Sequence, residues 1–94
     1  MPRYALRVDA NQGEIVQALT DAGYTVEVTG KPLDLLVGNP SKKHMVLPME
    51  VKVKNGKPTQ FQKGFFERWA GYPVSLVDSP EAALRHARLV LGDV

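Results

Sequence analysis

Alternation of apolar and polar residues over residues 47–54 predicts a strand at the centre of the chain. Three apolar residues alternate there with three charged ones, in the order Met49, Glu50, Val51, Lys52, Val53 and Lys54. Because successive side chains of a strand point to opposite faces, the three charged residues should share one face. An apolar run at 33–37, interrupted only by Asp34, predicts a second strand.

Apolar residues at helical spacing predict a first helix after Asn11 that ends at Gly23. Asn11 and Glu14 have the spacing of a capping box, in which two side chains satisfy the free amides at a helix start. Thr59 and Gln62 repeat this pattern before a second helix that runs to about residue 70. Its apolar face is formed by Phe61, Phe65, Phe66 and Trp69.

A third helix should begin after Ser79, with Pro80 at its first position. Its inward side chains would be Ala83, Leu84, Ala87, Val90 and Leu91.

The remaining segments have the composition of strands and turns. Strands are predicted at 4–8, 24–29, 33–37, 45–54 and 74–77, with a polar hairpin loop at 39–44. Apart from the short segment at 4–8, the order is α-β-β-β-α-β-α. This order indicates an α/β or α+β domain in which helices flank a small mixed sheet. The strands before and after the second helix should be parallel.

Composition limits the chain to one domain, residues 1–94, with an ordinary soluble composition. It has no cysteine, which excludes disulfides and thiolate metal sites. No apolar stretch resembles a signal peptide or a membrane span, so we expect a cytoplasmic protein with no membrane partner. The net charge of +2 and the pI of about 9.0 are compatible with nucleic acid without demonstrating it.

Asp34, Glu50 and Lys52 have the chemistry needed to hydrolyse a phosphodiester. Mg²⁺ takes oxygen ligands, typically one or two carboxylates with water and a phosphate oxygen. Asp34 and Glu50 could supply the carboxylates and the Val51 carbonyl a further oxygen, while Lys52 could contact the phosphate or orient the attacking water. Alternatively, Glu50 and Lys52 are solvated residues on an exposed face of the sheet.

Two more polar residues have alternative interpretations. Gln62 falls within the apolar arc of its helix, so it either completes the capping box or reaches the site and orients a water or phosphate. Glu14 either caps its helix or reaches the metal, directly or through water. His44 and His86 are expected at the surface.

Together, Glu14, Asp34, the sequence Glu50-Val51-Lys52 and Gln62 resemble the PD-(D/E)XK nuclease superfamily, and more narrowly the stand-alone, phage-type VRR-NUC domains. The similarity covers nearly the whole chain, from a helix with a glutamate to a closing strand and capped helix. The sequence departs from the superfamily pattern at one point: proline often directly precedes the aspartate there, whereas here Leu33 stands between Pro32 and Asp34.

The resemblance implies a restriction-endonuclease-like core and a Mg²⁺- or Mn²⁺-dependent DNA endonuclease of bacterial or phage origin. Asp34, Glu50 and the Val51 carbonyl would hold the metal, Glu14 would be an outer or second acid, Lys52 would be catalytic, and Gln62 would support the site. It also implies a homodimer acting on branched DNA such as Holliday junctions or flaps. Six lysines are candidate DNA contacts, although each could equally be ordinary surface: Lys31, Lys42, Lys43, Lys54, Lys57 and Lys63.

Two other functions compete with a structure-selective nuclease. One is a non-catalytic DNA-binding or scaffold module on the same fold. The other is a restriction-type enzyme that reads sequence, which 94 residues leave little room for beyond a catalytic core.

Overall fold

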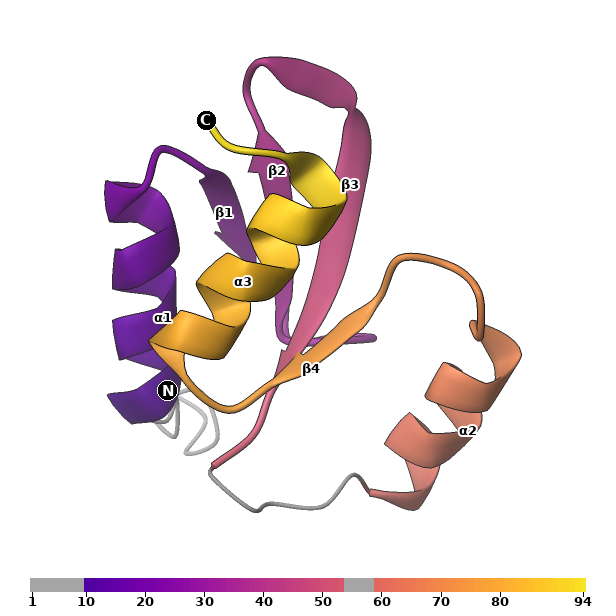
Figure 1. Cartoon of the computed structure of the whole chain (residues 1–94). Coiled ribbons are helices and arrows are strands. Elements are labelled where there is room, and N and C mark those ends of the chain that lie inside the picture. Colours follow the sequence, from indigo (N-terminus) through magenta and orange to yellow (C-terminus); the bar gives the residue numbers. More distant parts are fainter. Residues whose placement is uncertain (1–9, 54–58) are drawn as a thin grey trace.

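The structure, a computed structural model, describes residues 10–53 and 59–94 (Figure 1). Its elements are α1 (Ala10–Asp21), β1 (Thr25–Val28), β2 (Leu35–Asn39), β3 (Lys42–Val51), α2 (Gln60–Arg68), β4 (Ser75–Val77) and α3 (Pro80–Leu91). This order confirms the predicted mixed fold of three helices and one small sheet. The strand predicted at 4–8 lies outside the described residues.

The four strands form one sheet in the order β1-β2-β3-β4. The pairs β1–β2 and β2–β3 are antiparallel, and β3–β4 is parallel, as predicted. Leu35 at the start of β2 lies opposite Met49 near the end of β3. The residue before β2 and the residue after Met49 therefore meet at one end of this strand pair.

Helices α1 and α3 cover one face of the sheet, and α2 lies apart from them beside the lower end of β3 (Figure 1). Side chains at alternate strand positions point into the covered face, so Leu35 and Val37 are buried while Leu36 between them is exposed. The core includes Ile15, Leu19, Leu35, Val37, Leu47, Met49, Ala83, Ala87 and Leu91. Within residues 10–53 and 59–94, no helix is long and apolar enough to cross a membrane.

The predicted cap of the first helix is wrong. Asn11 lies inside α1, which already includes Ala10, so it is not the cap and does not form a box with Glu14. Its side-chain amide instead donates to the carbonyls of Lys52 and Asp78, at 2.8 and 3.2 Å. A tertiary contact with two distant strand ends thus replaces the local contact that the spacing indicated.

The predicted hairpin loop at 39–44 is too long. Residues 42–44 already belong to β3, and only residues 40 and 41 form the turn. Asn39 makes this turn tight: its side chain accepts from the Ser41 amide at 2.8 Å and donates to the carbonyls of Leu91, Gly92 and Asp93. This buried asparagine therefore joins the turn to the C-terminal end of α3.

The apolar face predicted for α2 is only partly buried. Phe65 is buried, but Phe61 and Trp69 are 60% and 42% exposed. The capping box of Thr59 and Gln62 is present as predicted, and Ser79 caps α3 with Pro80 following it. Strand β3 ends at Val51, so Val53 does not share the apolar face with Met49 and is exposed.

Candidate functional site

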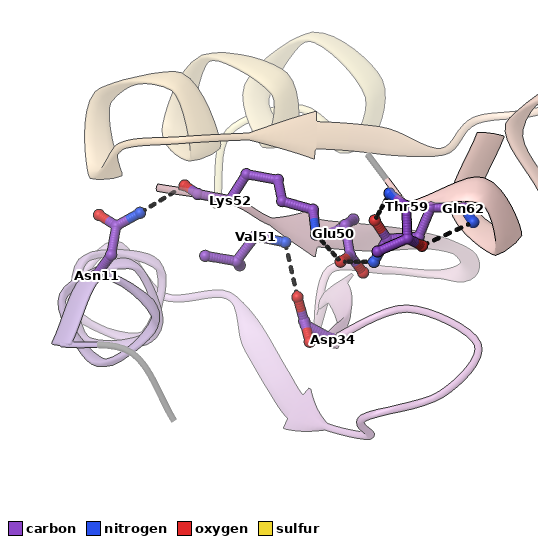
Figure 2. A network of polar contacts seen from close by, with 7 residues as sticks. All are labelled: Asn11, Asp34, Glu50, Val51, Lys52, Thr59 and Gln62. Carbon is purple, nitrogen blue, oxygen red and sulfur yellow. Dashed lines mark hydrogen bonds and ion pairs between the residues drawn. The ribbon is translucent and has the colours of Figure 1, made fainter. Parts of the chain in front are cut away.

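Asp34 is held at the entrance to β2 by contacts of its backbone and its side chain. Its carbonyl accepts from the amides of Thr29 and Gly30, at 2.8 and 3.3 Å. Its carboxylate Oδ2 accepts from the Val51 amide at 2.9 Å. Figure 2 shows Asp34 directed at the end of β3, beside Glu50. The turn after β1 therefore positions the aspartate that the sequence singled out.

Glu50 lies at the centre of this group of polar residues (Figure 2). It is 4% exposed, so it is not a solvated residue on an open face. Lys52 Nζ lies 3.5 Å from Glu50 Oε2, and Gln62 Nε2 donates to the same oxygen. The structure thus brings together four polar residues: Asp34 directly before β2, Glu50 in β3, Lys52 directly after β3, and Gln62 in α2.

Gln62 completes the predicted capping box and also contacts Glu50. Its Oε1 accepts from the Thr59 amide at 2.9 Å, and its backbone amide donates to Thr59 Oγ1 at 3.2 Å, which completes the capping box. With Oε1 occupied by the cap, Nε2 is the end of the amide that faces Glu50. The cap at the start of α2 therefore also orients the donor that reaches the site.

Burial and charge raise the pKa of Glu50 from its ordinary value of 4.5 to about 7. Desolvation is the largest cause, and the neighbouring Asp34 carboxylate raises the pKa further. The Lys52 ammonium acts in the opposite direction through its charge and its contact with Glu50. Two neighbouring carboxylates at a buried position, Asp34 and Glu50, would favour the binding of a cation.

The donor set of the site fits a hard divalent cation. Asp34 and Glu50 offer carboxylate oxygens side by side, and Mg²⁺ commonly takes one or two protein carboxylates with its remaining positions filled by water or phosphate. Like-charge repulsion between the two carboxylates is what a bound cation would relieve.

Glu14 is not brought into this group. It is exposed on α1, and the residue of α1 that contacts the end of β3 is Asn11, one turn earlier. Over residues 10–53 and 59–94, no three acidic, histidine or cysteine side chains gather closely enough to hold a metal ion together. The two carboxylates of Asp34 and Glu50 therefore stand without Glu14.

The predicted DNA-contacting lysines are scattered. Lys63 follows Gln62 on α2 and Lys31 lies in the turn before Asp34, both exposed. Lys42 and Lys43 begin β3, and at about 3.3 Å per residue they lie roughly 25 Å along the strand from Glu50. Lys54 and Lys57 lie outside the described residues.

Sequence reasoning missed that three residues lie next to Lys52. Asn11 was interpreted as a cap, His86 was expected at the surface, and Arg85, which the structure leaves exposed on α3, was given no role. His86 is half-buried, with Nδ1 2.9 Å from Ser75 Oγ, so it is less exposed than predicted. The place of Arg85 and His86 on a capped helix directly after a parallel strand could have indicated them, because such helices begin beside the carboxyl ends of strands.

Comparisons with protein families, with curated proteins and with solved structures found no match for this chain.

Proposed function

We propose that this protein is a metal-dependent DNA endonuclease whose active site contains Asp34, Glu50, Lys52 and Gln62. The observation that carries the proposal is their convergence: residues from the start of β2, the end of β3 and the first turn of α2 meet around one buried carboxylate. The resemblance of the sequence to VRR-NUC domains of the PD-(D/E)XK superfamily, with their restriction-endonuclease-like core, assigns functional roles to the same four residues.

Each residue has a distinct role in the proposed hydrolysis. Asp34, Glu50 and the Val51 carbonyl would hold Mg²⁺ or Mn²⁺, which supplies charge neutralisation at the phosphate and a more acidic water. Lys52 would donate to a phosphate oxygen or orient the attacking water. Gln62 would keep the Glu50 carboxylate in one orientation. We assign no role to Glu14, because it is exposed and outside this group.

The proposed substrate is branched DNA, of the Holliday-junction or flap type. This choice rests on the family resemblance. Exposed Lys31 and Lys63, on either side of the group in the sequence, are the predicted lysines best placed to contact phosphates.

Cleavage of labelled junction, flap and duplex DNA in Mg²⁺ or Mn²⁺ tests the proposal. Glu50→Gln and Lys52→Ala should each lower the cleavage rate by about 100-fold or more, because each removes a group that acts on the reacting phosphate. Controls are Glu27→Gln, on the exposed side of β1, and Arg88→Ala, which removes one positive charge from an exposed position on α3; both should cut like the parent.

Equal cleavage by the parent, Glu50→Gln and Lys52→Ala would show that the assigned site is wrong. If the parent binds junctions but cuts none of the substrates, the alternative of a non-catalytic DNA-binding or scaffold module on this fold replaces the nuclease.

We also propose that the protein is a homodimer, as the resemblance implies. Support comes from an apolar groove of about 320 Å³ between α2 and the open face of the sheet, where exposed Val46, Trp69 and Tyr72 line the walls. Sedimentation at micromolar concentration should show a dimer that Tyr72→Asp dissociates. Leu89→Asp, which changes an 85%-exposed leucine on α3, should leave the dimer intact. A monomeric parent would contradict the proposal.

A further inference from the structure

A polar cleft, separate from the apolar groove beside α2, lies between Lys52 and α3. It has a volume of about 260 Å³ and is lined by Lys52, Val53, Leu76, Val77, Asp78, Ala82, Arg85 and His86. Because β3 and β4 are parallel, their carboxyl ends meet at one edge of the sheet, and α3 starts there directly after β4 (Figure 1). Ligands of open α/β sheets commonly bind at the carboxyl ends of the strands.

Tertiary contacts hold the walls of this cleft. The Lys52 amide donates to the Val77 carbonyl at 2.9 Å, which keeps the two strand ends together. The Asn11 amide donates to the carbonyls of both Lys52 and Asp78, so α1 fixes the same two chain segments. On the α3 side, His86 is anchored by its contact with Ser75 Oγ. The cleft is thus bounded by residues whose positions the fold determines.

The cleft offers donors for an anion. Lys52 and Arg85 are cationic, against the single carboxylate of Asp78. Burial, and the nearby Arg85 charge, lower the pKa of His86, which favours the neutral ring. In the tautomer whose Nδ1 accepts from the Ser75 hydroxyl, Nε2–H is a donor. A guanidinium and a ring N–H are groups that contact DNA phosphates without reading sequence.

Lys52 belongs both to this cleft and to the group around Glu50. A DNA strand with one phosphate at Asp34 and Glu50 could therefore continue past Lys52 into the cleft. We propose that Arg85 and His86 form a subsite for the phosphate next to the one that is cleaved. This inference rests on the proposed function and deepens it, because it states where the substrate strand runs.

Salt-dependent DNA binding tests the subsite without requiring cleavage. Binding of the parent and of Arg85→Ala to a labelled junction is measured in EDTA between about 0.05 and 0.2 M salt. Arg85→Ala should reduce the slope of log K against log salt by about 0.9, which is roughly eightfold weaker binding at 0.1 M. The matched control is Arg88→Ala. Arg88 lies one turn further along α3, carries the same charge, and pairs with Asp93 outside the cleft. Arg88→Ala should retain the parent's slope.

A pair of histidine variants tests the other half of the subsite. His86→Asn keeps a polar atom near Ser75 but lacks a donor at the position of Nε2, so it should bind more weakly than the parent. His86→Gln places an amide close to the position of Nε2 and should bind more tightly than His86→Asn. Urea unfolding of each variant shows whether it is folded.

The outcomes separate this inference from the proposed function. If the parent cuts DNA while Arg85→Ala and Arg88→Ala bind with the same slope, the subsite is wrong and the nuclease stands. If Arg85→Ala alone loses slope but the parent cuts nothing, the subsite stands and the nuclease falls. Absence of DNA binding by the parent would overturn both.

Discussion

Glu50 is the residue on which the site depends. Among the described residues, Glu50 is the one buried residue with a charged side chain, and it lies near a second carboxylate, that of Asp34. Burial of a charge is costly unless partners or a bound ion compensate for it. Lys52 and Gln62 supply part of that compensation. The raised pKa shows that they do not supply all of it, which is typical of functional sites.

The raised pKa of Glu50, about 7 against the ordinary 4.5, predicts how stability depends on pH. The folded state holds this proton more tightly than the unfolded chain, so its contribution to stability is complete below about pH 4.5 and is lost as pH rises through about 7. Glu50→Gln removes the titration. We expect it to be more stable than the parent at about pH 8, by on the order of 2 kcal/mol, and to match the parent near pH 4.5. Urea unfolding without divalent cations measures this difference.

A bound cation should act on the same carboxylate. Millimolar Mg²⁺ at about pH 8 should raise the unfolding midpoint of the parent, since a ligand of the folded state stabilises it. Glu50→Gln should respond much less, whereas Glu27→Gln should respond like the parent. In the pH experiment without cations, parallel profiles of unfolding free energy for the parent and Glu50→Gln would contradict the assignment of the titration to Glu50.

At the scale of elements, α2 supports the site through its first turn. The capping box that starts the helix uses one end of the Gln62 amide and leaves the other end for Glu50. Only Phe65 of this helix is buried, so the cap has a large share in defining where α2 begins. The cap and the site are therefore coupled through one side chain.

Two variants separate the cap from the site. Gln62→Glu keeps a capping box, since glutamate is favoured at this position, but places a third carboxylate against Glu50. It should cut DNA about 10-fold more slowly or worse and lose stability above pH 7. Thr59→Ala weakens the cap, at a cost of about 1 kcal/mol in unfolding free energy, while Gln62 keeps its donor. Thr59→Ala should retain most of the activity. If Thr59→Ala cut DNA more slowly than Gln62→Glu, Gln62 would act only as a cap.

At the scale of the whole molecule, the ends of β3 and β4 are tied to α1. The Asn11 amide reaches carbonyls 41 and 67 residues further along the chain. This contact is far from local in sequence, yet it holds the segment that carries Lys52. The first helix thus contributes to the site through Asn11 rather than through the predicted Glu14.

Asn11→Ala should lower the unfolding free energy by about 1–2 kcal/mol, because two carbonyls at the strand ends lose their donor. It should also slow cleavage, since the backbone of Lys52 is less firmly held. Gln17→Ala is the control: it lies on the same helix, and its one described side-chain bond is a local one to Asp21. It should change stability by no more than about 0.5 kcal/mol. Denaturant unfolding and a cleavage assay check both expectations.

Local patterns explain why the fold was predictable. The strand around Glu50, the capping box at Thr59 and the N-cap at Ser79 depend on neighbours within four residues, and the structure retains them. Asn11 and Asn39 were misinterpreted because their partners are distant: each gives its side chain to backbone carbonyls far along the chain. The same cause hid the cleft lined by Arg85 and His86, which exists only when α3 lies beside the end of β3.

By itself, the sequence determined the order of the elements, the parallel pairing around α2, and three of the polar residues that meet at Glu50, because periodicity and spacing are local properties. Only the tertiary structure decided that Glu50 is buried rather than solvated, that Gln62 caps and contacts Glu50 together, and that Asn11 rather than Glu14 faces the strand ends. Those outcomes depend on how the helices pack against the sheet, and the local spacing of residues does not determine how distant segments pack.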